Sequence, residues 1–164
     1  MSPWISSASC IALVGARPVF VDVRDDMNID PDLIEGAITS RTKAILPVHL
    51  TGRSARMDEI VAIAKAHDLA LIEDAAQAVG ARYQDRAVGS FGDVGCFSLH
   101  PLKNLNACGD GGIITCSDDS LDHKLRLMRN HGLVDRDHVQ RWGFCSRLDS
   151  IQAAILGFRM GNLD

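Results

Sequence analysis

The sequence contains 164 residues, of which 46% are hydrophobic and 23% are charged, and its net charge at neutral pH is −4. This length and composition are typical of one globular domain with a substantial hydrophobic core. Basic and acidic residues are interspersed, so no basic patch indicates nucleic-acid binding. No apolar run reaches the roughly 18 residues that a membrane-spanning helix needs. We therefore expect neither nucleic acid nor a membrane as a partner.

Helical periodicity and strand-like apolar runs alternate along the chain. Helices are expected over 3–14, 31–38, 57–67, 119–129 and 148–158, and strands over 18–23, 43–50, 69–72, 94–99 and 113–116. Strand–helix–strand repeats of this length favour right-handed βαβ units. The pattern therefore predicts an α/β fold with three αβα layers and a mostly parallel sheet.

Capping residues mark several of these helix ends. Gly15 suits the C-cap of the first helix, and Asp30 suits the N-cap of the second, which opens with Pro31. Ser117 or Asp118 is expected to cap the helix over 119–129. Because proline cannot donate to a strand ladder, we expect Pro47 at a bulge or at the exit of its strand.

Five cysteines are present: Cys10, Cys96, Cys108, Cys116 and Cys145. Their number is odd, no C-x-x-C pair occurs, and their spacing does not fit a zinc site. Small thiols in apolar surroundings favour buried, reduced cysteines in a cytoplasmic protein. The N-terminus also lacks the basic-then-apolar pattern of a signal peptide.

The most informative stretch runs from Leu69 to Lys103. Glu73 and Asp74 follow the apolar run at 69–72 directly, and Lys103 lies just beyond the run at 94–99. Ligands of open parallel sheets bind outside the carboxyl ends of the strands, so both side chains could face one pocket. A carboxylate can keep a ring nitrogen protonated, and a partly desolvated lysine can form a Schiff base with an aldehyde. Pyridoxal phosphate (PLP) chemistry requires both groups.

Simpler interpretations exist for each residue. An aspartate at a strand end is most often a helix N-cap or a surface charge, and a lysine in a loop is usually a solvated cation. His49, at the end of another expected strand, is more often a structural histidine with hydrogen-bond partners than a catalyst. The glycine-rich segment 109–112 lacks the ending of a P-loop, and we expect it to permit a tight turn into a strand.

Three ordered motifs extend the argument beyond spacing: EDAAQA at 73–78, GCFSLHPLKN at 95–104 and GDGG at 109–112. Together they resemble the sugar-nucleotide aminotransferases of the DegT/DnrJ/StrS family, over nearly the whole chain from about Pro3. The resemblance implies the large domain of a fold-type-I PLP enzyme. It also implies transamination of a nucleotide-linked keto-sugar with an amino-acid donor, glutamate in this family. Some relatives are dehydratases with histidine at the lysine position, so Lys103 favours transamination.

The resemblance also implies roles for individual residues. Lys103 would be the catalytic lysine and Asp74 the partner of the pyridinium nitrogen. Trp4 and Ala76 would cover the two faces of the cofactor ring. Two further contacts are implied: Gln77 near the phenolic oxygen, and Ser98 at the phosphate. Without the family, Gln77 is equally a helix-start hydrogen bond and Ser98 a turn-forming serine.

Two departures from the family pattern are visible. The segment GFCSRLD at 143–149 has Cys145 where the family usually has an asparagine that reaches the neighbouring subunit's cofactor phosphate, and a thiol is a poor donor. Family members also begin before the position of Pro3, with a Gly-Thr turn for the phosphate, and continue into a small C-terminal domain. We therefore expect 1–164 to be a single PLP-binding large domain, incomplete at its N-terminus and without the small domain.

Family active sites form at dimer interfaces, so a homodimer is expected. Two alternatives stay open. The chain could be a catalytically inactive fragment or structural subunit of this fold, which the absent phosphate turn and Cys145 favour. It could also be a generic nucleotide-binding α/β module, although it carries neither a Rossmann nor a P-loop fingerprint.

Overall fold

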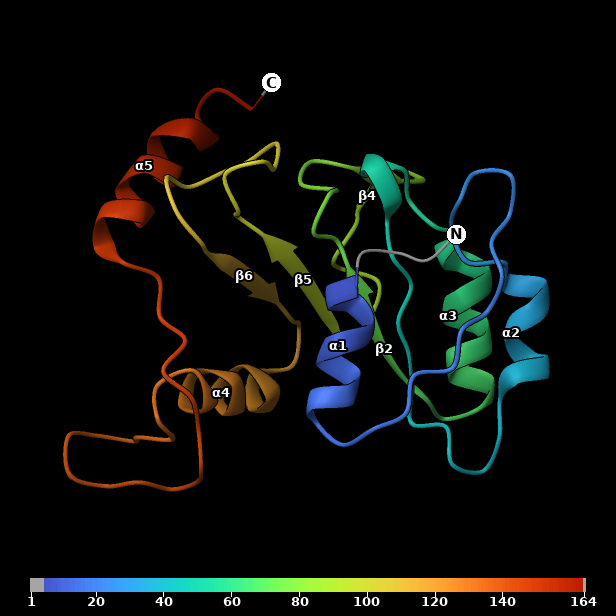
Figure 1. The fold of residues 1–164 in the computed structure, drawn as a ribbon, viewed down its shortest axis with the longest axis horizontal. Coiled ribbons are helices and arrows are strands. Elements are labelled where there is room, and N and C mark those ends of the chain that lie inside the picture. Colours follow the sequence, from blue (N-terminus) through green and yellow to red (C-terminus); the bar gives the residue numbers. More distant parts are fainter. Residues whose placement is uncertain (1–4, 164) are drawn as a thin grey trace.

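The computed structural model describes residues 5–163 and shows an α/β fold built on a four-stranded sheet (Figure 1). The sheet consists of β1 (Ala44–Ile45), β2 (Ala70–Asp74), β5 (Val94–Ser98) and β6 (Gly112–Thr115), in the order β1-β2-β5-β6. The first three strands are parallel and β6 is antiparallel to β5. The expected α/β class with a mostly parallel sheet is thus confirmed.

A short antiparallel hairpin and several helices complete the described part of the chain. The hairpin pairs β3 (Arg82–Tyr83) with β4 (Arg86–Ala87). The α-helices are α1 (Ile5–Leu13), α2 (Pro31–Ala37), α3 (Met57–Ala66), α4 (Asp119–Met128) and α5 (Ser150–Met160), and a 3-10 turn, η1, covers Leu50–Gly52. In Figure 1, α2 and α3 lie on the β1 side of the sheet, whereas α4 and α5 lie on the β6 side. No helix within 5–163 is both long and apolar enough to cross a membrane.

The largest buried cluster lies where α2 and α3 meet β1 and β2. Ile34, Ile45, Met57, Ile60 and Leu71 are all buried there. Met57, Ile60 and Ala64 fall on one face of α3, while Asp58 and Glu59 in its first turn favour the positive end of the helix dipole. This packing anchors β2, and with it the sheet edge where Asp74 ends the strand.

Helix caps follow the sequence closely. Asp30 caps α2 by accepting a hydrogen bond from Asp32 N–H, and Asp118 caps α4 by accepting one from Leu121 N–H. Gly15 follows α1 with φ of +78°, a conformation that glycine adopts at little cost. These local signals succeed because a cap is decided within one helical turn.

Two predicted strands differ in the structure. Residues 18–23 form no strand, and their only bridge within the described chain joins Val23 to Ile29. The strand predicted over 43–50 shortens to Ala44–Ile45, with Pro47 two residues past its end. A run of β-branched residues becomes a strand only when a ladder partner is present, and 18–23 has none along its length within the described chain. The 43–50 segment does pair with β2, and the pairing resumes at the bridge between Val48 and Asp74, but Pro47 has no N–H to donate and interrupts the ladder.

The prediction of buried cysteines is wrong, because none of the five thiols is fully buried. Cys10, Cys108 and Cys145 are exposed, while Cys96 and Cys116 are half-buried. All five are free thiols. Cys10 lies in α1 and Cys145 in the segment after β6, and apolar residues in both places also stay exposed, such as Leu13 and Trp142.

Candidate functional site

Asp74 is the last residue of β2 and lies half-buried at the carboxyl edge of the sheet. Its Oδ2 accepts a hydrogen bond from the Ser7 hydroxyl at 2.6 Å, and its Oδ1 accepts one from the Ala76 backbone N–H at 3.1 Å. The bond to Ala76 resembles an N-cap, but only turns follow it, over 75–80. Helix α1 and the turn after β2 therefore fix the carboxylate from two sides.

Glu73 precedes Asp74 and points to the opposite face of the strand, where it is fully buried. Its carboxylate accepts four hydrogen bonds, from His49 Nε2 and from the backbone N–H groups of Gly89, Phe91 and Gly92, at 2.6–3.0 Å. Burial raises the pKa of Glu73, but the bonds from His49, Gly92 and Gly89 outweigh it and hold the pKa below its ordinary value. Glu73 is therefore ionised at neutral pH.

His49 is the second fully buried polar side chain at this edge. The Ala55 backbone N–H donates to its Nδ1 at 3.1 Å, which leaves Nε2 as the protonated nitrogen that donates to Glu73. The His49 backbone N–H also donates to the Asp74 carbonyl at 2.9 Å. The structural interpretation of His49 thus fits its surroundings, since both ring nitrogens already have partners.

Gln77 lies in the turn after β2 and contacts η1. Its side-chain oxygen Oε1 accepts a hydrogen bond from the Thr51 backbone N–H at 2.8 Å. Thr51 has a φ of +54° and Gly52 a φ of +83°, so this turn holds two successive residues in the left-handed region. Gln77 therefore ties the 49–55 segment to the turn that follows Asp74.

Cys96 lies opposite Asp74 in the neighbouring strand β5. Burial, followed by the negative charge of Asp74 and the proximity of Cys10 and Glu73, raises the pKa of Cys96 to about 11. The thiol is therefore protonated at neutral pH and is not an activated nucleophile.

Ser98 ends β5 at the same sheet edge as Asp74, and its Oγ accepts a hydrogen bond from the His100 backbone N–H at 3.3 Å. Lys103 lies in the turn that follows, where its backbone N–H donates to the His100 carbonyl at 2.8 Å. Leu99 and Leu105 are buried on either side of this turn and anchor it to the sheet. The Lys103 side chain is half-buried and forms no ion pair or hydrogen bond with any other residue in 5–163.

The structure thus brings Asp74, Ala76, Gln77 and Ser98 to the carboxyl ends of two adjacent parallel strands, with Lys103 in the turn after the second. Trp4 lies outside the described residues. Sequence reasoning missed Ser7, Glu73 and His49 as a network around Asp74. The only available signals were the serines in the first helix and the Glu-Asp pair itself, and neither specifies a partner far along the chain.

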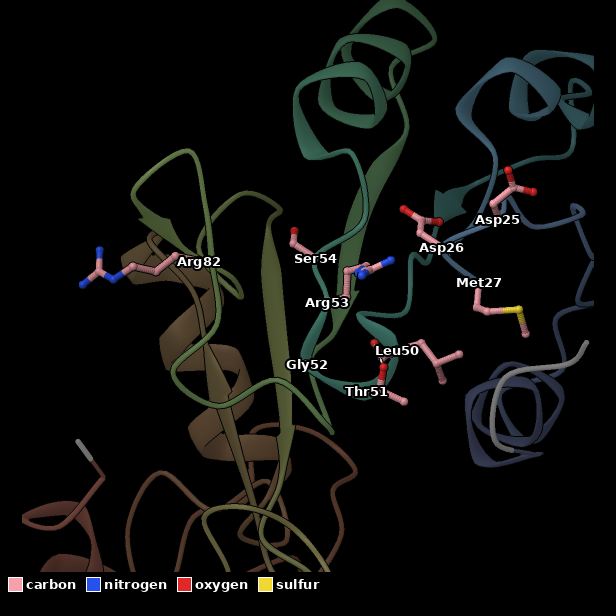
Figure 2. Close-up of a pocket in the computed structure, with 9 residues that line it drawn as sticks. All are labelled: Asp25, Asp26, Met27, Leu50, Thr51, Gly52, Arg53, Ser54 and Arg82. Carbon is pink, nitrogen blue, oxygen red and sulfur yellow. Dashed lines mark hydrogen bonds between the residues drawn. The ribbon is translucent and has the colours of Figure 1, made fainter.

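A polar surface hollow of about 680 Å³ opens beside η1, between the 25–27 turn and the 50–54 segment (Figure 2). Asp25, Asp26, Arg53 and Arg82 contribute two charges of each sign to its lining. In Figure 2, Arg53 points toward Asp26 and Met27, whereas Arg82 points away from them. None of the described site residues predicted from the sequence lines this hollow, so it is a separate surface feature.

Comparison with known proteins places this fold in one class, the PLP-type aminotransferase fold. The model of the DegT/DnrJ/EryC1/StrS aminotransferase family matches residues 2–164, and the chain belongs to that family. The resemblance inferred from the three motifs is therefore confirmed.

Individual relatives are similar over nearly all of this chain. A UDP-N-acetyl-3-dehydro-alpha-D-glucosamine 3-aminotransferase from Acidithiobacillus ferrooxidans is 53% identical over 156 residues, which are 93% of this chain and 42% of that protein. A pleiotropic regulatory protein from Geobacillus stearothermophilus is 49% identical over 162 residues, or 98% of this chain and 44% of that protein. The structure of Streptomyces venezuelae DesV in complex with a ketimine intermediate matches with a TM-score of 0.96 and 44% identity, covering 99% of this chain and 44% of that one. The chain thus spans less than half the length of the relatives it matches.

Proposed function

We propose that this chain carries the PLP-binding part of an aminotransferase that transfers an amino group from an amino acid, glutamate, to a nucleotide-linked keto-sugar. The observation that carries the proposal is the Asp74 carboxylate, fixed at the carboxyl end of β2 beside the strand that leads to Lys103. Family membership and the sugar-aminotransferase relative support the substrate class.

The residues at the sheet edge fit PLP chemically. Asp74 offers a carboxylate to a protonated ring nitrogen, Ala76 offers a small side chain beside a flat ring, and Lys103 offers an amine without an ion-pair partner in 5–163. The hydroxyl of Ser98 can donate to a phosphate, because its recorded bond uses the oxygen only as an acceptor. When bound, PLP supplies an electron sink that stabilises negative charge at the donor's Cα.

Each residue then has a defined task. Asp74 would hold the protonated ring nitrogen, and Ser7 orients Asp74 through the 2.6 Å hydrogen bond. Lys103 would bind the cofactor through its aldehyde and, once the donor amine has displaced it, would move the proton at the donor's Cα. Gln77 accepts from Thr51 through Oε1, so its amide nitrogen stays available to donate to the phenolic oxygen. Trp4 would cover the second face of the ring.

We also propose that the active unit is a homodimer, with the segment around Cys145 facing the neighbouring subunit. Cys145 is exposed, and its backbone forms an isolated antiparallel β-bridge with Asn130 where the 130–147 loop begins and ends. Because a thiol donates weakly to a phosphate, this contact would be weaker than one from an asparagine. That weakness favours the second candidate, an inactive subunit of the same fold, which the experiment below distinguishes.

The test is the absorbance spectrum of the purified chain with PLP, before and after borohydride, for wild type and Lys103→Ala. The chain has four lysines, at 43, 65, 103 and 124, so peptide mapping can locate the reduced adduct unambiguously. We expect an imine absorbance band that borohydride removes, leaving the reduced cofactor covalently attached to Lys103. Lys124→Ala, on the exposed face of α4, is the matched control and should leave the band unchanged.

A missing band, or a band that persists in Lys103→Ala, would contradict the cofactor assignment. A normal band without amination of UDP- and dTDP-linked keto-sugars in the presence of glutamate would favour the inactive subunit.

A further inference from the structure

The loop that carries Lys103 connects β5 to β6 and spans residues 99–111. Its base is packed, because Leu99 and Ala107 are buried in one cluster and the Ala107 backbone N–H donates to the Leu99 carbonyl at 2.8 Å. Its tip is not packed in this way, since Leu102 exposes 87% of its surface. Lys103 therefore lies in the part of the loop whose position apolar packing does not fix.

Side-chain amides hold the tip of the loop instead. Asn106 donates from Nδ2 to the Pro101 carbonyl at 2.5 Å, and Arg159 of α5 donates to the Oδ1 of Asn106. Asn104 donates from Nδ2 to the Val79 carbonyl at 2.7 Å. In Figure 1 the loop is drawn in yellow and passes close to α5. The tip is thus attached to α5 on one side and to the turn after β2 on the other.

The Asn104 contact joins the two segments that meet at the candidate site. Val79 lies in the turn that follows Asp74, and Asn104 directly follows Lys103. Within 5–163, no other side chain of the loop bonds to that turn, and no other donor reaches the Val79 carbonyl. The contact therefore couples the position of Lys103 to that of Asp74.

This coupling matters because a pyridine ring is rigid. Its nitrogen and its aldehyde carbon lie at one fixed distance, which the Asp74 carboxylate and the Lys103 amine have to match. The sheet fixes Asp74, but β5 ends at Ser98, so the sheet alone does not fix Lys103. A misplacement of about 1 Å in such an alignment can cost about a hundredfold in rate.

We propose that Asn104 is a positioning residue for Lys103: by donating to the Val79 carbonyl, its side-chain amide sets the separation between the Lys103 amine and the Asp74 carboxylate. The inference deepens the proposed function and rests on it. Asn104 acts only through Lys103, so its loss affects a ligand that carries an aldehyde and spares a ligand that does not.

The test compares PLP with pyridoxine 5′-phosphate, which has the same ring and phosphate but an alcohol in place of the aldehyde. Asn104→Leu keeps the branched shape of the side chain and removes its donor. The variant should bind PLP about tenfold more weakly than wild type, followed by the absorbance band. It should bind pyridoxine 5′-phosphate as wild type does, followed by calorimetry. A change that merely disturbed the fold would weaken both ligands.

A second readout needs no cofactor. Acetylation of the free chain by dilute acetic anhydride, followed by peptide mapping, gives the reactivity of each lysine. The Lys103 amine is half-buried in wild type, and in Asn104→Leu it should react about threefold faster because the tip of the loop opens more often. The exposed Lys65 and Lys124 should react as they do in wild type.

Asn162→Leu is the matched control. Asn162 also donates from a side-chain amide to a backbone carbonyl at an exposed position, that of Phe158 at 3.1 Å, but it lies just after α5. This variant should bind both ligands and acetylate as wild type does. Its melting temperature should change as little as that of Asn104→Leu, because each variant loses one exposed hydrogen bond.

Equal weakening of both ligands in Asn104→Leu would overturn the proposal, and so would unchanged PLP binding or unchanged acetylation of Lys103. If wild type itself forms no band with PLP, the proposed function fails and this inference fails with it. A normal wild-type band together with an unaffected Asn104→Leu variant overturns the inference alone, so the two failures are distinguishable.

Discussion

His49 donates from Nε2 to the Glu73 carboxylate at 3.0 Å, and neither side chain has any solvent exposure. The same histidine donates its backbone N–H to the carbonyl of Asp74, the residue after Glu73. The pair therefore holds the buried Glu73 side chain and the main chain of Asp74 at the end of β2. The Asp74 carboxylate itself is held by the Ser7 hydroxyl and the Ala76 backbone N–H.

Glu73→Gln should destabilise the fold by about 3 kcal/mol, because a buried amide donor would face backbone N–H groups that have lost their acceptor. Urea unfolding near neutral pH measures the loss. Glu59→Gln is the control, since Glu59 forms a surface ion pair with Arg56, and such a pair contributes about 0–1 kcal/mol. Equal losses in the two variants would contradict the assigned role of Glu73.

The pH dependence of unfolding gives a second measure of Glu73. Its pKa in the folded chain lies below the ordinary 4.5, so its ionised form stabilises the fold fully above that ordinary value. This contribution is lost as the pH falls through the lower folded pKa. Wild type should therefore lose stability in that acid range, and the Glu73→Gln variant should lack this part of the slope. Parallel plots of unfolding free energy against pH for the two proteins would contradict this contribution of Glu73.

Ser7→Ala removes the hydroxyl that donates to Asp74 at 2.6 Å. We expect a loss of about 1–2 kcal/mol in unfolding free energy, because the bond has a charged acceptor. The matched control is Ser9→Ala on the same helix, where the hydroxyl bonds only to the Ile5 carbonyl at an exposed position. A larger effect at Ser9 would show that α1 stability, and not the Asp74 contact, controls the result.

Gly95→Ala should be strongly destabilising, because a Cβ at Gly95 would lie 2.4 Å from the Gly89 backbone. Gly89 belongs to the turn held by Glu73, so the new methyl group would push that turn away at a cost of about 1–3 kcal/mol. Gly36→Ala in α2 meets nothing within 4 Å and should stabilise the chain by about 0.5–1 kcal/mol. Thermal melts of both variants test the contrast in sign.

Tyr83 is the only tyrosine in the chain, so its ionisation can be followed by ultraviolet absorbance without interference. Its hydroxyl donates to Asp58, and this bond raises the pKa of Tyr83 to about 12. Asp58→Asn should return the titration toward the ordinary value of 10. The neutral hydroxyl is the stabilising form, so its contribution is present below the ordinary value and is lost as the pH rises through the folded one. An unchanged titration in Asp58→Asn would exclude Asp58 as the cause.

Local chemistry in the sequence predicted much of the fold. The caps Asp30 and Asp118 and the helix at α3 are decided by neighbours within a few residues. The end of β2 was placed to within two residues: the strand was predicted to end at Ile72 and ends at Asp74. The family was identified from the three motifs at 73–78, 95–104 and 109–112 and not from hydrophobic periodicity.

Features that depend on distant partners could not be predicted in this way. Ser7 reaches Asp74 across 67 positions, and His49 reaches Glu73 across 24. The segment 18–23 has strand composition, yet composition cannot show whether a ladder partner lies beside it. The roles of Lys103, Gln77 and Ser98 stay predictions, to be tested by the spectrum and its variants.

The Glu73 carboxylate has a consequence for recognising other pieces of this fold. It binds His49, 24 positions earlier, and the backbone of Gly89 and Gly92, 16 and 19 positions later. A sequence pattern that requires His49, Glu73, Gly89 and Gly92 at these spacings would select chains that can form the same buried hydrogen bonds. Such a filter would separate segments able to build this sheet edge from those that share the letters EDAAQ by chance, even when the lysine itself falls outside the fragment.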